Sequence, residues 1–199
     1  MPRRDIREAI LDATERLLAR KGYRQMTMDD IASESGVARR TIYLRFPGKE
    51  QVALDSIDRV VERLLDRLRT IAAETAAPDA RLHAMLVARV MFRFDSVQDY
   101  HHSFTEMFAA IRPAYLARRE KYFDCEAELF AEVLDEGRQE QSLTFADTAS
   151  TAQTLLLATN ALLPFSLSAR ELGSRSVVEA RVQRIADLVV AGLRADIGR

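Results

Sequence analysis

Apolar residues recur at intervals of three and four along most of the chain, which is the period of one face of an α-helix. The first such segment runs from about residue 5 to 21, and a long one begins at Lys49 and ends near Pro78. Further helical segments are expected at about residues 79–95, 99–110, 113–138, 145–169 and 175–195. No segment alternates apolar and polar residues like a half-buried strand, so the pattern predicts an all-α fold.

Between the first two segments lie two short helices with clear start and stop signals. Thr27 followed by Asp30 predicts a capping box, and Gly36 supplies the positive φ of a tight turn before a second helix at about residues 38–44. The apolar residues of this region, expected to face inward, are Ile31, Val37 and Ile42. The polar side chains of the second helix then remain outside, where they are able to enter a major groove. The spacing predicts a helix-turn-helix.

Charge is unevenly distributed along the 199 residues, although the formal net charge is only −1. Residues 1–49 contain 11 Lys and Arg against 7 Asp and Glu, a net +4, whereas residues 50–199 contain 18 against 23, a net −5. The basic N-terminal part, residues 1–49, is called the head below. Its charge, opposite to that of the acidic remainder, favours a polyanion as its partner.

Composition and motifs argue against several other classes. The single cysteine, Cys125, has no partner for an internal disulfide and fits a reducing cytoplasm. No apolar run reaches the length of a membrane span or forms a signal-peptide core. His102 and Glu106 have the i, i+4 spacing of a metal pair, but no Cys or His cluster has zinc-site spacing, so we expect no metal and no cofactor. No nucleophile elbow, phosphate loop or HExxH helix indicates an enzyme.

The helix-turn-helix region is similar to a known family. The residues that carry the similarity are Gly22-Tyr23, Thr27-Met28-Asp29-Asp30-Ile31-Ala32, Gly36-Val37, Thr41-Ile42-Tyr43, Phe46 and Lys49-Glu50. Their types and spacing together resemble the tetracycline-repressor (TetR/AcrR-type) family of bacterial transcriptional regulators. The resemblance implies a three-helix DNA-binding domain at residues 1–48 and a helical ligand-binding and dimerisation domain at residues 49–199.

The resemblance also implies contacts with double-stranded operator DNA. The residues expected to make them are Arg3, Arg4, Thr27, Arg39, Arg40, Thr41, Tyr43, Arg45 and Lys49. Arg39–Thr41 would face base edges, where the fork of an arginine matches O6 and N7 of guanine. The others would contact phosphates or reach the minor groove, although Arg45 is equally explained as a solvated charge. Ala38 departs from the family pattern, which often has a capping Ser there, so the cap is expected to be weak.

Aromatic and methionine side chains gather in the middle of the chain. Most are ordinary core residues, but together with a few polar groups they also suit a largely apolar small-molecule cavity. The resemblance implies an effector site in this region. Its expected lining is Phe92, His101, Phe104, Met107, Phe108, Tyr115, Arg118, Tyr122, Thr159 and Asn160.

The last two helical segments carry more apolar surface than one helix face needs. Paired with the same helices of a second subunit, they would form a four-helix interface, which the resemblance also implies. The residues expected at this dimer face are Leu155, Leu156, Leu163, Val182, Ile185 and Val189.

These expectations combine into one function and one alternative. The chain is expected to be a repressor that binds a near-palindromic operator as a homodimer and is released by a small, largely apolar effector. Activator action fits the same motif, because the sign of regulation depends on where the operator lies. The alternative is a helical ligand-binding or interaction protein whose head does not read a DNA sequence.

Overall fold

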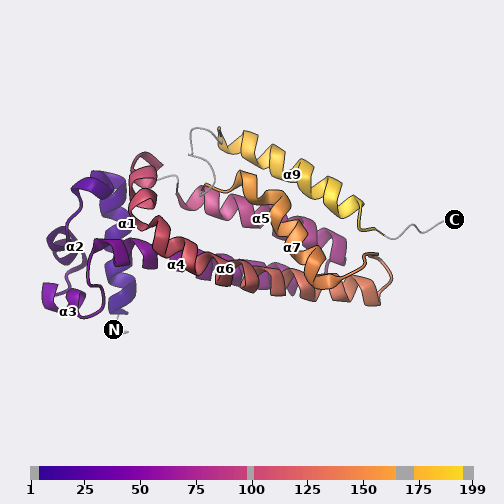
Figure 1. The fold of residues 1–199 in the computed structure, drawn as a ribbon, viewed down its shortest axis with the longest axis horizontal. Helices are drawn as coiled ribbons and strands as arrows, with labels where there is room; N and C mark the ends of the chain where they lie inside the picture. Colours follow the sequence, from indigo (N-terminus) through magenta and orange to yellow (C-terminus); the bar gives the residue numbers. More distant parts are fainter. Residues whose placement is uncertain (1–4, 98–100, 165–172, 195–199) are drawn as a thin grey trace. The chain divides into compact units, whose positions relative to one another are not determined.

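The computed structural model describes residues 5–97, 101–164 and 173–194, with the backbone alone described for residues 101–105. The chain divides into two compact units, whose helices are labelled in Figure 1. Unit 1 comprises Met1–Val60 with Val97–Arg118, and unit 2 comprises Val61–Ser96 with Arg119–Arg199. The described residues form helices, turns and one isolated bridge, which confirms the predicted all-α fold. The domain boundary expected after residue 48 stays a prediction.

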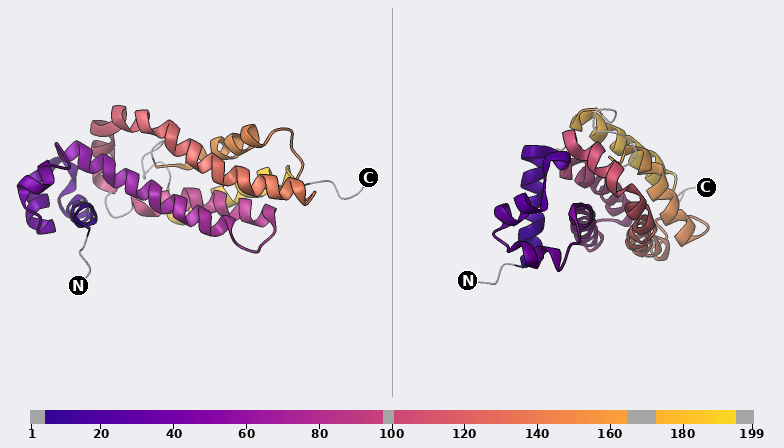
Figure 2. Two further views of the ribbon diagram at one scale, coloured as in Figure 1. Left: turned by 90° about the horizontal axis from the view of Figure 1, so that it is seen from below. Right: turned by 60° about the vertical axis from the view of Figure 1, so that its left-hand side comes forward.

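Unit 1 begins with α1 (Ile6–Gln25), the helix on which the helix-turn-helix rests (Figure 2). The carboxylate of Asp5 caps α1 by accepting a hydrogen bond from the Arg7 amide at 2.9 Å. Gly22 has φ 75°, so the helical path breaks directly after the predicted end at residue 21, and one further turn follows. The apolar face of α1 is buried, as its spacing predicts.

α2 (Met28–Ser35) and α3 (Arg39–Tyr43) form the helix-turn-helix. Gly36 between them has φ 69°, a left-handed conformation that residues with a side chain rarely adopt. Ile31 and Ile42, two of the three residues expected to face inward, are fully buried. The short helices are therefore held from inside by apolar packing, and the polar side chains of α3 are left outside.

Three longer helices follow, namely α4 (Lys49–Ala72), α5 (Pro78–Ser96) and α6 (His101–Gln139). α4 and α6 each contribute residues to both units. The break predicted between residues 110 and 113 is wrong, because α6 continues through Pro113. Proline has no N–H group, so the carbonyl group of Ala109 lacks an intrahelical donor. Pro113 and Ala109 are both exposed, so this carbonyl group lies on the solvent side, where a proline is tolerated.

The remaining described elements belong to unit 2. α7 (Thr148–Thr159) ends in a 3₁₀ turn, η2 (Asn160–Leu162), well before the predicted end at residue 169, and residues 165–169 lie outside the described residues. α9 (Arg175–Ala191) packs along α5 (Figure 1). The apolar core between them consists of Val90, Met91, Phe94, Leu162, Leu163, Val178 and Val182. None of the described helices combines the length and apolarity that a membrane crossing needs.

A buried ionic cluster joins three helices of unit 2. Arg89 and Arg93 of α5 both pair with the carboxylate of Glu126 on α6, and all three side chains are buried. Arg89 also donates to Oγ1 of Thr159 at 2.6 Å and to Oδ1 of Asn160 at 2.9 Å. The cluster therefore fixes the end of α7 against α5 and α6.

Glu126 is ionised in this environment because its partners are cationic. Desolvation by burial acts to raise the pKa of Glu126, but the charges and hydrogen bonds of Arg93 and Arg89 outweigh it and hold the pKa below its ordinary value. A carboxylate whose pKa is lowered by folding stabilises the fold above its unfolded-state pKa, which is about 4.5. The contribution is lost as the pH falls below that value.

Glu126→Gln is expected to lower the free energy of unfolding at pH 7 by about 3–5 kcal/mol, because it leaves two buried guanidinium groups without a counter-charge. The difference from the wild type should shrink as the pH falls below 4.5. Urea unfolding followed by circular dichroism measures both effects. Glu128→Gln, on the same helix but exposed, is the control. Equal unfolding free energies for the wild type and Glu126→Gln would contradict this role.

Candidate nucleic-acid interface

The base of the helix-turn-helix is fixed by one buried guanidinium. Arg59 of α4 is 2% exposed and pairs with three carboxylates of α1. The nitrogen–oxygen distances are 3.1 Å to Glu8, 2.8 Å to Asp12 and 2.6 Å to Glu15. Burial acts to lower the pKa of Arg59, but the hydrogen bonds and charges of these carboxylates, Glu15 foremost, raise it above its ordinary value. The charge on Arg59 therefore holds α1 against α4.

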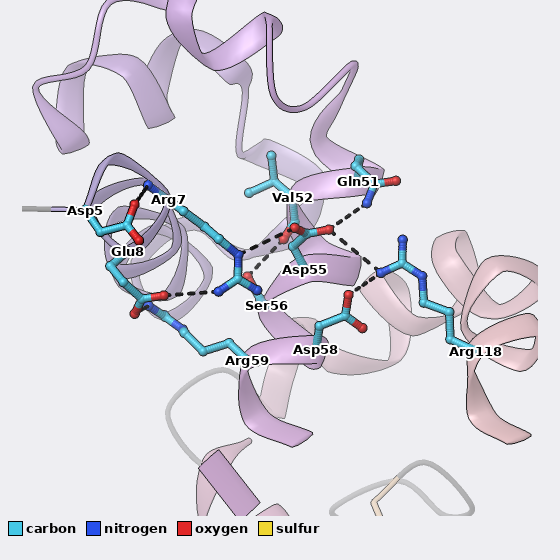
Figure 3. Close-up of polar contacts among 10 residues, drawn as sticks. All are labelled: Asp5, Arg7, Glu8, Gln51, Val52, Asp55, Ser56, Asp58, Arg59 and Arg118. Atoms are coloured by element: carbon cyan, nitrogen blue, oxygen red, sulfur yellow. Dashed lines mark hydrogen bonds and ion pairs between the residues drawn. The ribbon is translucent and has the colours of Figure 1, made fainter. Parts of the chain in front are cut away.

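Two further carboxylates on α4 reach neighbouring helices (Figure 3). Asp58 pairs with Arg118 of α6. Asp55 lies 3.9 Å from Nε of Arg7 on α1 and 3.8 Å from Nη1 of the same Arg118, and it accepts a hydrogen bond from Gln51 at 2.6 Å. All of these residues belong to unit 1. Asp55 thus stands between a cation of α1 and a cation of α6.

The start of α2 is held by the capping box that the sequence predicts. The Asp30 amide donates to Oγ1 of Thr27 at 3.1 Å, and the Thr27 amide and hydroxyl donate to the Asp30 carboxylate at 3.0 and 2.9 Å. Lys21 of α1 pairs with the same carboxylate at 2.6 Å. Hydrogen bonds from Lys21 and Thr27 lower the pKa of Asp30 to about 2. The hydroxyl proton of Thr27, which a phosphate contact would use, is engaged within the chain.

Lys49 also has partners within the chain. Its Nζ donates to the backbone oxygens of Tyr23, Arg24 and Met26 at 3.3, 3.5 and 3.4 Å, and it lies 4.7 Å from the centre of the Tyr23 ring. Carbonyl groups at a helix end lack intrahelical donors, so an ammonium group satisfies them well. Lys49 therefore ties the start of α4 to the end of α1, and its contact with phosphate stays a prediction.

The outer side of α3 carries cations that are available to a polyanion. The side chains of Arg40 and Arg45 are exposed and have no ion-pair partner among the described residues. Arg39 pairs with Asp29 of α2 at 2.8 Å and lies 5.4 Å from the centre of the exposed Tyr43 ring. Such an exposed pair contributes little to stability, so Arg39 is able to leave Asp29 at small cost.

The other expected DNA contacts are less clearly placed. Thr41 is half-buried in α3. Ala38 at the start of this helix provides no side-chain hydrogen bond, which agrees with the expected weak cap. Arg3 and Arg4 lie outside the described residues.

One residue of this surface was missed from the sequence. Leu44, directly after α3, is 79% exposed, more than any other large apolar side chain of the described residues. Ile42 and Phe46, four residues apart, are buried, and the three residues between them are exposed. The i, i+4 spacing of the buried pair is visible in the sequence, but a leucine in an apolar pattern is ordinarily assigned to the core.

The residues expected to line an effector cavity fall into both units. Arg118, Thr159 and Asn160 have ionic or hydrogen-bonding partners of their own, as described above. The rings of Phe108 and Tyr115 meet edge to face with centroids 5.1 Å apart. Met107 is buried, Phe92 and Tyr122 are half-buried, and the side chains of His101 and Phe104 lie outside the described residues. The lining stays a prediction.

A surface cavity of about 330 Å³ lies on unit 2 and contains none of the expected lining residues. It is bounded by Asp124, Ala127, Glu128, Ala131, Ala149, Ala152 and Gln153, from α6 and α7. Among the described residues, no group of three or more His, Cys, Asp or Glu side chains is placed to hold a metal ion.

The residues expected at a dimer face are turned largely toward their own chain. Leu155, Leu156, Leu163 and Val182 are buried within unit 2, whereas Ile185 and Val189 are half-buried. The large apolar side chains that α7 and α9 leave exposed are Leu157, Val177 and Leu188. No partner chain tests the predicted set, but the exposed side chains are better placed for contact with a second subunit.

A helix-turn-helix with exposed arginines, followed by a helical second unit, defines the chain as an all-α helix-turn-helix protein. The family described as bacterial regulatory proteins, tetR family, matches residues 10–55, which include both α2 and α3. The helix-turn-helix region of the chain is therefore similar to that of the TetR family.

Individual relatives support the family from sequence and from fold. The transcriptional regulator EthR of Mycobacterium tuberculosis is 40% identical over 79 residues, which are 39% of this chain and 37% of EthR. The chain thus matches little more than a third of the length of this relative. A TetR/AcrR-family regulator of Thermobifida fusca is 27% identical with a TM-score of 0.62, over 96% and 99% of the two chains. FadR of Bacillus subtilis, in complex with stearoyl-CoA, is 18% identical with a TM-score of 0.63, over 94% and 99%.

Asp30→Asn is expected to lower the midpoint of thermal unfolding at pH 7, because it removes the carboxylate that receives Lys21 and Thr27. Since folding lowers the pKa of Asp30 from 3.8 to about 2, this contribution is present above pH 3.8 and is lost as the pH falls toward 2. The difference from the wild type, followed by circular dichroism, should disappear over that range. Glu106→Gln, an exposed change in α6, is the control. A difference that persists unchanged at pH 2 would rule out the charge as its cause.

Proposed function

We propose that the chain is a ligand-responsive transcriptional regulator that binds near-palindromic operator DNA as a homodimer and acts as a repressor. The observation that carries the proposal is the outer side of α3, where Arg40 and Arg45 are exposed and have no ionic partner among the described residues. The net charge of +4 over residues 1–49 favours the same partner. The regulators among its relatives support this function for the family.

The proposed contacts divide into those that read bases and those that position the head. Arg40 reads a guanine through its fork, and Arg39 joins it after leaving Asp29. Tyr43 and Arg45 contact phosphates. Arg3 and Arg4 either contact phosphates or reach into the minor groove. Thr27 and Lys49 remain candidates for phosphate contacts, and both also have structural roles in the free chain.

Selection of bound sequences from a random DNA pool at near-physiological salt tests the proposal, since salt suppresses binding that is merely electrostatic. Enrichment of a near-palindrome supports a dimeric sequence-specific regulator. Retention of DNA without enrichment, or no retention at all, favours the alternative function, a helical ligand-binding or interaction protein.

Arg40→Ala is expected to weaken binding to the selected operator by about 1–3 kcal/mol and to relax the preference for one guanine in each half-site. Fluorescence anisotropy with the operator and with single-base variants measures both quantities. Arg67→Ala is the matched control, because Arg67 is an exposed arginine of α4 outside the helix-turn-helix. A uniform loss of affinity for all sequences would make Arg40 a phosphate contact instead.

The ion pairs around Asp55 and Asp58 suggest how an effector controls the head. They connect α6 with α4, and the Arg59 pairs connect α4 with α1. An effector that favours one position of α6 therefore also favours one position of the helices beneath α2 and α3, and it changes operator affinity by linkage. We propose a small, largely apolar effector. FadR in complex with stearoyl-CoA shows that a protein of this fold holds a ligand with a long acyl chain.

The proposed dimer pairs the exposed apolar side chains of α7 and α9 with those of a second subunit. Leu157 and Leu188 are 64% and 69% exposed, so burying them removes apolar surface from water. A two-fold dimer would place the two recognition helices about 34–36 Å apart, one turn of DNA.

Leu188→Asp is expected to shift the dimer toward monomer, because a carboxylate at an apolar interface loses its hydration without gaining a partner. Sedimentation velocity at micromolar concentration measures the shift. Leu116→Asp is the control, because Leu116 is an exposed leucine of α6 in unit 1. A wild-type protein that sediments as a monomer would contradict the dimer, and an unchanged dimer in Leu188→Asp would place the interface elsewhere.

A further inference from the structure

Leu44 is an apolar side chain in the middle of a basic surface. It is 79% exposed, and it lies between Arg40 and Arg45, whose side chains are exposed and have no ionic partner among the described residues. A single exposed leucine is common on protein surfaces and by itself needs no explanation. This leucine differs because its position is on the face that the proposed function directs into a major groove.

The position of Leu44 relative to Arg40 is well defined. The Leu44 amide donates to the Arg40 carbonyl oxygen at 3.1 Å, which is the i to i−4 hydrogen bond of an α-helix. The backbone angles of Leu44, φ −67° and ψ −22°, are also helical. Residues four apart lie one above the other on the same helix face, with Cβ atoms about 5–6 Å apart. Arg40 in α3 and Leu44 directly after it therefore project on the same side.

The major groove offers few partners for an apolar side chain. Its base edges are hydrogen-bond donors and acceptors, with the exception of the C5-methyl group of thymine. A leucine that enters the groove beside a guanine-reading arginine gains most by packing against this methyl group. Successive bases are about 3.4 Å apart along the helix axis, so two side chains separated by about 5–6 Å reach bases no more than about two steps apart.

We propose that Leu44 is a specificity-determining residue that packs against the methyl group of a thymine within two base pairs of the guanine read by Arg40. The inference rests on the proposed function, because it requires α3 to enter a major groove. It adds an apolar contact to the arginine contacts, and it predicts a guanine and a thymine in close succession in each half-site.

Replacement of thymine by uracil in the DNA tests this contact directly, because it removes the methyl group and leaves base pairing unchanged. In the selected operator, each thymine is replaced in turn, symmetrically in both half-sites, and affinity is measured by fluorescence anisotropy. For the wild type, one replacement should weaken binding about fourfold per half-site, the worth of one buried methyl group. The sensitive thymine should lie within two base pairs of the guanine for which Arg40→Ala loses its preference.

Leu44→Ala is the matching protein variant. It should bind the thymine operator more weakly than the wild type does, and uracil at the sensitive position should cause no further loss of affinity. Leu116→Ala, which shortens an exposed leucine outside the helix-turn-helix, should keep the wild-type sensitivity. Circular dichroism during thermal unfolding should give Leu44→Ala the midpoint of the wild type, because the removed atoms are exposed in the free protein.

The outcomes separate this inference from the proposed function. If no thymine is sensitive in the wild type, or if Leu44→Ala keeps the sensitivity, the contact with a methyl group is wrong. A loss of affinity in Leu44→Ala that is equal for all sequences would also overturn it and would place Leu44 against the sugar-phosphate backbone. Failure to enrich any DNA sequence would overturn the proposed function and this inference together.

Discussion

The helix-turn-helix depends on the burial of one guanidinium group between α1 and α4. Arg59 is almost without solvent, and three carboxylates of α1 surround it. Removing an arginine from water is costly, and only several close, hydrogen-bonded carboxylates offset that cost. The requirement makes the placement of α1 on α4 specific, because a shift along either helix would leave a buried charge without its partners. α2 packs on α1, and α3 packs on α2.

The same stretch of α4 links the helix-turn-helix to α6. Asp58 and Asp55 face Arg118, and Asp55 also faces Arg7 of α1. These side chains are partly exposed, so each pair contributes less than the buried Arg59 pairs. A strong attachment of α1 thus lies beside a weaker attachment of α6. Such a difference suits the proposed switch, in which α6 changes partners while α1 and α4 stay together.

Local signals in the sequence predict the helix-turn-helix well. Thr27 with Asp30 and the glycine Gly36 define the ends of α2 through interactions within a few residues, and the structure has both. The predicted break before Pro113 fails because an exposed proline is tolerated inside a long helix. The predicted end of α7 fails because Pro164 favours an extended conformation for the residue before it, and Leu163 is extended with φ −81° and ψ 140°.

Long-range pairing is the part of the structure that the sequence pattern does not predict. The sequence alone does not indicate that Glu126 faces Arg89 and Arg93. Of the leucines in α7, the sequence pattern selects Leu155 and Leu156 for a dimer, yet these fill the core of their own unit. Helical periodicity identifies an apolar face but does not say whether that face meets the same chain or another.

The proposed DNA-binding surface is defined better by side chains that have few contacts in the free chain than by the residues of the family motif. Thr27 and Lys49 belong to the motif, and both satisfy groups of their own chain, namely an amide and a carboxylate at α2 and carbonyl groups at the end of α1. Arg40 has no ionic partner among the described residues, and Leu44 has an apolar surface that the core does not cover. Because a contact with DNA competes with any contact already made in the free chain, residues without such contacts gain the most on binding. In the proposed complex, Thr27 and Lys49 stabilise the helix-turn-helix, and Arg40 and Leu44 select the DNA sequence.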